Sequence, residues 1–138
     1  MADYDLIVRN ARIVTEDRQT EGDIGVKDGK VAAIEPGLKG TAIREIDAGN
    51  KFVLPGGIDS HAHIEQKSGF GIMCADDFYS GTVSAAFGGT TTVIPFAAQH
   101  RGMSLRQVVK DYHEAAGPKA VIDYAFHLIV TDPSQQAL

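Results

Sequence analysis

The sequence contains a single cysteine, Cys74, among 138 residues, so no disulfide can form within the chain. A lone thiol is typical of a reducing compartment, and Cys74 is interpreted as a packing residue because no neighbour in the sequence would activate it. The chain also lacks an apolar run of about 20 residues and the basic and apolar segments of a signal peptide. We therefore expect a cytoplasmic protein without a membrane span.

Clusters of lysine and arginine are absent too, and the formal net charge is −5. This balance argues against nucleic acid or an anionic membrane as a partner. The composition is otherwise that of a folded protein, with 43% hydrophobic and 22% charged residues. Disordered and fibrous classes are therefore excluded.

Residues 1–51 show short strands and turns with no helical period. Strands are predicted at residues 4–8 and 11–14, and two more, at 23–26 and 30–34, flank Asp28-Gly29. Asp-Gly is typical of a two-residue hairpin turn that needs positive φ at both positions. This segment is predicted to be a small β-domain that is incomplete by itself.

Residues 52–138 alternate between strand and helix patterns. Strands are predicted at 52–58, at 90–94 and at 120–130, the last nearly all apolar and therefore expected to be buried on both faces. The order β-α-β-α-β is typical of a parallel sheet or barrel.

Two helices are predicted between these strands. Asp76 or Asp77 is expected to cap the first, which Gly88-Gly89 ends, and Ser104-x-x-Gln107 is expected to form the capping box of the second. The buried face of the first should comprise Phe78, Tyr79, Thr82, Val83, Ala86 and Phe87, and that of the second Leu105, Val108, Val109, Tyr112 and Ala116.

The residues that carry chemistry follow directly after the strand at 52–58. His61 and His63 are two residues apart, so on extended chain they project to the same side. Neutral imidazole binds zinc at about 2.0–2.1 Å, and the pair is a candidate for sharing one metal ion. Asp59 is a candidate to orient one of the imidazoles through its second ring nitrogen. The alternative is a pair of surface histidines, since His-x-His recurs by chance, but the preceding Pro-Gly-Gly and the strand context favour metal.

Residues 54–63, Leu-Pro-Gly-Gly-Ile-Asp-Ser-His-Ala-His, resemble the first-strand signature of the amidohydrolase superfamily, and the flanking sequence resembles its hydantoinase and dihydropyrimidinase branch. Further matches lie at 75–78, 88–92 and 123–127. The resemblance implies an α/β fold, a (β/α)8 TIM-barrel metallo-hydrolase with a small β-sandwich domain. Such a barrel needs about 250 residues. Residues 1–51 would then be the N-terminal part of the sandwich, and 52–138 the first β-α-β-α-β of the barrel.

The resemblance also implies the activity, namely hydrolysis of a cyclic amide that opens a hydantoin or 5,6-dihydropyrimidine ring to an N-carbamoyl amino acid. Two divalent metal ions, expected to be zinc and bridged by a carboxylated lysine outside this chain, would form the centre. His61 and His63 match the pair on the more buried ion. Beyond these ligands no catalytic residue is expected within the chain, so the 138-residue piece alone should be inactive. Relatives suggest a homo-oligomer, a tetramer.

Alternative functions remain open at this point. One alternative is an enzyme that acts on another cyclic ureide, such as allantoin. A second is a non-catalytic dihydropyrimidinase-like scaffold, and a third is an independent metal-binding or assembly module. Retention of both histidines argues against the scaffold. Glu65 disfavours the dihydroorotase branch, which typically has an arginine there to hold the substrate carboxylate.

The loop at 64–74 contains Phe70, Ile72 and Met73, which are candidates to line the pocket for the ring substituent, with plain packing as the alternative. His127 is expected to be a hydrogen-bonded core residue rather than a third metal ligand. No chemistry is assigned to His100 or His113.

Overall fold

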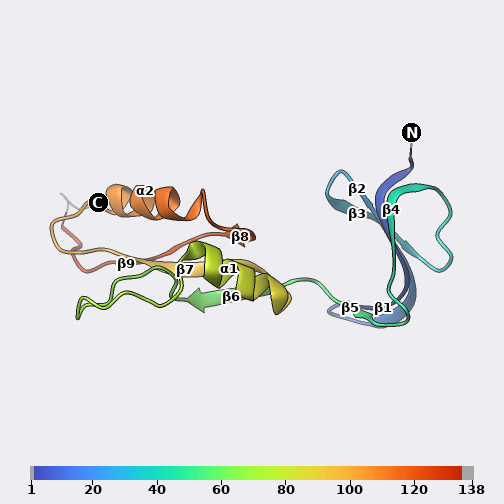
Figure 1. Cartoon of the computed structure of the whole chain (residues 1–138), viewed down its shortest axis with the longest axis horizontal. Helices are drawn as coiled ribbons and strands as arrows, with labels where there is room; N and C mark the ends of the chain where they lie inside the picture. Colours follow the sequence, from blue (N-terminus) through green and yellow to red (C-terminus); the bar gives the residue numbers. More distant parts are fainter. Residues whose placement is uncertain (1, 135–138) are drawn as a thin grey trace. The chain divides into compact units, whose positions relative to one another are not determined.

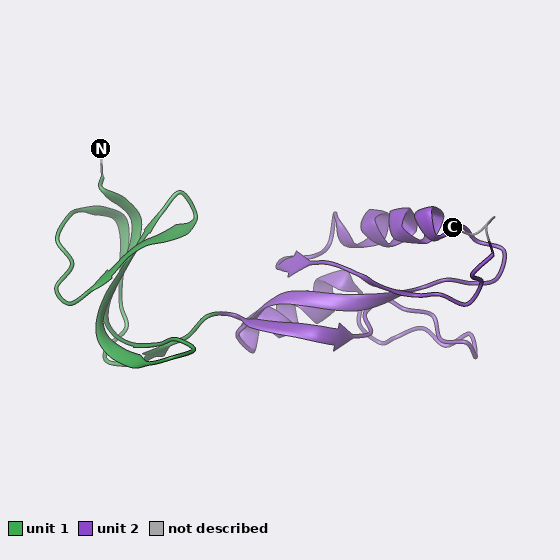
Figure 2. Cartoon of the chain, turned by 180° about the vertical axis from the view of Figure 1, so that it is seen from behind, with its two compact units in different colours: residues 1–55 green, residues 56–138 purple. Residues whose placement is uncertain are grey.

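The computed structural model describes residues 2–134 of the chain. The chain divides into two compact units between Pro55 and Gly56 (Figure 2). Within residues 2–134, the first unit contains strands only, and the second contains strands and two helices (Figure 1). Among the described residues, neither helix is long and apolar enough to cross a membrane.

The first unit is a mixed sheet in the order β3-β2-β1-β4, with β5 also paired to β1. Strands β1 and β2, and β2 and β3, are antiparallel, whereas β4 and β5 run parallel to β1. Its strands are β1 (Tyr4–Val14), β2 (Gln19–Lys27), β3 (Lys30–Glu35), β4 (Ala42–Asp47) and β5 (Phe52–Val53). Strand β1 therefore holds the unit together, and its apolar residues Ile7, Ala11 and Ile13 are buried.

The hairpin turn predicted at Asp28-Gly29 is confirmed, with φ of 51° and 71°. One other prediction for this unit is wrong, and one strand was not predicted. Residues 4–8 and 11–14 form one strand, because Asn10, with φ of 53°, lies in an irregularity of pairing between Val8 and Ala11 rather than in a turn. A bulge of this kind bends a strand without ending it. Strand β4 was not predicted, since its pattern carries no local signal and its pairing partner is distant in sequence.

Asp23 is a buried carboxylate that joins three parts of the first unit. Its Oδ1 accepts from the Asn10 amide at 2.9 Å, and its Oδ2 accepts from the Leu38 amide at 3.0 Å and from Arg9 Nη1 at 3.2 Å. Burial raises the pKa of Asp23, but these hydrogen bonds outweigh it, so the pKa lies below its usual value. The ionised carboxylate thus fixes the irregular part of β1 to the segment after β3.

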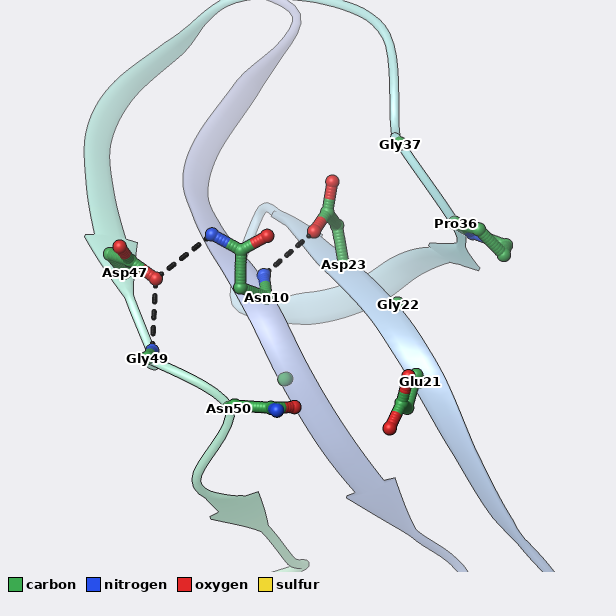
Figure 3. A pocket seen from close by; sticks show the side chains of 10 residues that line it. Asn10, Glu21, Gly22, Asp23, Pro36, Gly37, Asp47, Gly49 and Asn50 are labelled. Atoms are coloured by element: carbon green, nitrogen blue, oxygen red, sulfur yellow. Dashed lines mark hydrogen bonds between the residues drawn. The ribbon is translucent and has the colours of Figure 1, made fainter.

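A cavity of about 520 Å³ lies beside this carboxylate (Figure 3). Asp47 Oδ1, at its edge, accepts from Asn10 Nδ2 at 3.0 Å and from the Gly49 amide at 2.9 Å. Asn50, which also lines it, has φ of 66°. Asn10, Asp23, Asp47 and Gly49 are joined there by hydrogen bonds, which makes them parts of the turn structure.

The second unit is a parallel sheet, as the alternating pattern predicts. Strand β7 pairs in parallel with β6, with β8 and with β9. The elements are β6 (Gly57–Ala62), α1 (Phe78–Phe87), β7 (Thr90–Ala98), α2 (Leu105–Ala116), β8 (Asp123–Tyr124) and β9 (His127–Ile129). The core beneath the helices is formed by Ile64, Phe78, Val93 and Ala116.

The bounds of all three predicted strands need correction. The strand predicted at 90–94 continues through Pro95 to Ala98 as β7. Residues 52–58 are divided between β5 and β6 by Leu54, Pro55 and Gly56, and β6 continues through His61 to Ala62. A side chain at Gly56 would overlap that of Thr91, so the chain enters the sheet at a point where only glycine fits. Residues 120–130 form two short strands, and Val121 is half exposed because this segment lies at the edge of the sheet.

Both predicted helices are present with their caps. Asp77 Oδ1 accepts from the Ser80 amide at 2.8 Å and Ser104 Oγ from the Gln107 amide at 3.2 Å. The capping box at Ser104 is only half formed, because the Gln107 side chain bonds to Asp111 instead. Val108 and Ala116 of α2 are buried as predicted.

The predicted buried face of α1 is too wide. Phe78 and Thr82 are buried, but Tyr79 and Phe87 are 58% and 91% exposed. Ala86, one turn after Thr82, is exposed as well, so the buried part of α1 is limited to Phe78 and Thr82.

We expect Asp23→Ala to lower the free energy of unfolding by about 1–3 kcal/mol, because two backbone N–H groups and Arg9 lose their acceptor. Urea unfolding of the full-length protein measures this change. Glu21→Ala, an exposed carboxylate on the same strand, is the matched control and should change stability little. Equal stability of the two variants would contradict the role given to Asp23.

Candidate metal centre

His61 and His63 lie at the carboxyl end of β6, beside the central strand β7. The pairing of β6 with β7 shifts between Asp59 and Ala62, and the Asp59 Oδ1 accepts from the His61 amide at 3.0 Å. A local irregularity of this kind re-aims the side chains that follow it. The expected contact of Asp59 was with an imidazole; the structure gives it the backbone amide instead, and a role beside a metal stays a prediction.

The two imidazole rings are close enough to share an ion. Their ring centres are 5.6 Å apart with an interplanar angle of 75°. Two imidazoles on one tetrahedral zinc ion, bound at about 2.0–2.1 Å, have ring centres roughly 5 Å apart. The donor types and this spacing fit one divalent ion. Within residues 2–134 no group of three or more His, Cys, Asp or Glu side chains is placed to hold a metal, so the pair supplies part of a coordination shell.

Phe96 of β7 supports both rings, a contact that was not predicted. Its ring centre lies 4.7 Å from that of His61 in an edge contact and 5.3 Å from that of His63 in a stacked one. Aromatic contacts of this geometry stabilise ring orientation beyond simple burial. The sequence carries no local signal for this contact. It depends on the register of two parallel strands, which is known only once the sheet is known.

Gln66 is a second residue that was not predicted. Its side chain is 9% exposed, and its Oε1 contacts His63 Nδ1 in a hydrogen bond. His63 thus has one ring nitrogen engaged by protein and the other available for a ligand.

His127, from β9, completes the group of rings around Phe96, with ring centres 5.2 Å apart. Its Nε2 lies 3.1 Å from the Ser60 carbonyl oxygen, so this nitrogen donates to strand β6. The hydrogen bond agrees with the prediction for His127, but the residue is exposed rather than part of the core, because β9 lies at the edge of the sheet.

The loop between β6 and α1 carries the predicted pocket residues. Phe70, Ile72 and Met73 are 95%, 70% and 52% exposed, and a β-bridge joins Lys67 to Met73. They are therefore available to a ligand, and their role stays a prediction. A cavity of about 480 Å³ adjoins His63, and the residues that line it include Gln66, Cys74, Gln99, His100, Ile129 and Thr131.

Glu65 anchors this loop instead of facing the histidine pair. Its Oε1 lies 2.6 Å from Lys119 Nζ, and its Oε2 accepts from the Phe78 amide at 3.0 Å. The hydrogen bond with Glu65 raises the pKa of Lys119. Glu65 therefore fixes the loop to the start of α1 and to the segment after α2.

Residues 52–132, more than half of the chain, match the model of the amidohydrolase family. The chain belongs to the amidohydrolase family. Family membership agrees with the resemblance seen in the sequence and with the parallel β-α-β-α-β order of the second unit.

Named relatives narrow the family to one branch. The chain is 48% identical over 134 residues to a D-hydantoinase from Rhizobium radiobacter and 40% identical over 131 residues to the dihydropyrimidinase of Rattus norvegicus. These alignments cover 97% and 91% of this chain but 29% and 25% of the relatives. A solved structure of a D-hydantoinase matches with a TM-score of 0.90 and 47% identity over 96% of this chain and 29% of that one. The chain thus spans less than a third of the length of these relatives.

Acid should weaken the cap of α1. The amide of Ser80 donates to Asp77 and lowers its pKa below the usual value, so the ionised carboxylate stabilises the fold above about pH 4, and this contribution is lost as the pH falls through the lowered pKa. Asp77→Asn keeps a capping oxygen but cannot ionise. We expect the stability difference between parent and Asp77→Asn to shrink between about pH 5 and pH 2.

Urea unfolding at several pH values measures this difference. Asp123→Asn, an exposed carboxylate of the same unit, is the control. A difference between parent and Asp77→Asn that stays constant across the range would show that the charge on Asp77 contributes nothing.

Proposed function

We propose that the protein carrying this sequence is a metal-dependent cyclic amidase. It opens the ring of a hydantoin or 5,6-dihydropyrimidine by hydrolysis and gives an N-carbamoyl amino acid. The observation that supports the proposal most directly is the pair of imidazoles, 5.6 Å apart, at the carboxyl end of a parallel strand in a chain similar to hydantoinases and dihydropyrimidinases. Active sites of barrel enzymes lie at this end of the strands.

The chemistry of the substrate explains the need for a metal. A cyclic ureide carbonyl is a poor electrophile at neutral pH, and a bound divalent ion polarises it and lowers the pKa of bound water to about 7. His61 and His63 would hold this ion. Phe96, packed against both rings, keeps them oriented.

The finer features of the proposal come from the family resemblance. They are zinc as the metal, a second ion bridged by a carboxylated lysine outside this chain, a (β/α)8 barrel with a β-sandwich, a homotetramer and a cytoplasmic location. The parallel order of β6, β7, β8 and β9 supports the barrel. The mixed sheet of residues 1–55 supports the sandwich.

The loop residues Phe70, Ile72 and Met73 are proposed to contact the substituent on the substrate ring. Their large exposed apolar surfaces support this role, because an apolar group in a binding loop gains free energy when a ligand covers it. The loop is anchored at its base by Glu65, which leaves the apolar tip free to present these side chains.

The test is metal content and hydrolysis of dihydrouracil and 5-phenylhydantoin by the full-length protein and by His61→Ala/His63→Ala. We expect ring opening by the parent, with bound divalent metal, and loss of both activity and one or more metal ions in the double variant. His113→Ala, an exposed histidine of α2, is the control and should keep both. A parent that binds no metal and opens neither ring would indicate the non-catalytic scaffold.

A further inference from the structure

The contact between Gln66 and His63 has a chemical consequence for the metal ligand. Gln66 follows Glu65, whose φ of 48° places it in the left-handed region. The backbone reverses at this residue, so the buried Gln66 side chain returns to the imidazole three residues before it. The backbone of Gln66 is also held in place, because the Cys74 amide donates to the Gln66 backbone carbonyl oxygen at 3.0 Å.

The oxygen of a carboxamide accepts hydrogen bonds and cannot donate them. Gln66 Oε1 lies against His63 Nδ1, and this contact is a hydrogen bond when the neutral imidazole carries its proton on Nδ1. The lone pair then lies on Nε2, the nitrogen that remains for a ligand. A histidine that binds a metal through one nitrogen normally donates from the other to such an acceptor.

We propose that Gln66 is a positioning residue that fixes the Nδ1–H tautomer and the ring orientation of His63 for metal binding. The inference rests on the proposed metal centre and names a partner that the His-x-His motif does not contain. The neighbouring ring contacts agree with it, because Phe96 stacks on the face of His63 at 19° and leaves the ring edge to Gln66. Phe96 restrains the ring plane, and Gln66 restrains rotation within that plane.

The experiment compares zinc affinity of the full-length protein with that of Gln66→Leu and Gln66→Glu, by competition with a fluorescent chelator. Loss of an outer-shell partner typically costs about 10- to 100-fold in metal affinity. We expect a loss of this size in Gln66→Leu. Gln66→Glu should keep the affinity of the parent, because its carboxylate accepts from Nδ1–H and carboxylates are common partners of ligating histidines.

Gln107→Leu, on the surface of α2, is the matched control and should bind zinc as the parent does. Melting of each metal-free variant reports whether the fold is intact. Gln66→Met, unbranched and similar in length to glutamine, replaces the leucine variant where leucine is not accommodated.

Unchanged zinc affinity in Gln66→Leu would overturn the proposal, and so would an equal loss in Gln66→Leu and Gln66→Glu, since packing alone would explain that result. Failure of the proposed function gives a different result. In that case the parent itself binds no zinc, and His61→Ala/His63→Ala is indistinguishable from it. If the parent binds zinc through the histidine pair and Gln66→Leu binds it with the same affinity, the proposed metal centre stands and only the positioning role of Gln66 is overturned.

Discussion

Parallel pairing of β7 with strands on both sides is the constraint on which the second unit depends. Residues that are distant in sequence meet at its carboxyl end because parallel strands end at the same edge. Phe96, near that end, touches His61 of β6, His63 directly after β6 and His127 of β9. The two helices cover the other side of the strand around Val93. The histidine pair is therefore positioned by the sheet rather than by its own short motif.

Buried polar contacts fix the loops at this edge. Gln99, 2% exposed, accepts from the Thr131 and Asp132 amides, each at 2.9 Å, and donates to the Met103 carbonyl at 2.9 Å. One side chain thus ties the loop after β7 to the loop after β9. Unpaired amides in such a position would be costly. Glu65 anchors the base of the loop after β6 through its bonds with the Phe78 amide and Lys119. Each of these three loops is therefore held by a polar side chain.

Sequence patterns predicted the elements whose signals are local. The Asp28-Gly29 turn, the caps at Asp77 and Ser104 and the alternating order of the second unit depend on residues within a few positions of one another. Strand β4 and the division of residues 52–58 depend on pairing partners far away in the chain, and they were not predicted. The same distinction applies to the site. The His-x-His motif is local, whereas Phe96 reaches it only through the register of β6 on β7.

Gln66 shows a different limit of sequence reasoning, because it lies only three residues from His63 and still was not predicted. A continuing strand would have carried it along the sheet edge, out of reach of the imidazole. The positive φ of Glu65 turns the chain back, and a non-glycine residue adopts this conformation at a cost that its surroundings must offset. The bonds from Glu65 to Lys119 and to the Phe78 amide supply that offset. The ion pair at the base of the loop therefore holds the backbone that brings Gln66 to His63.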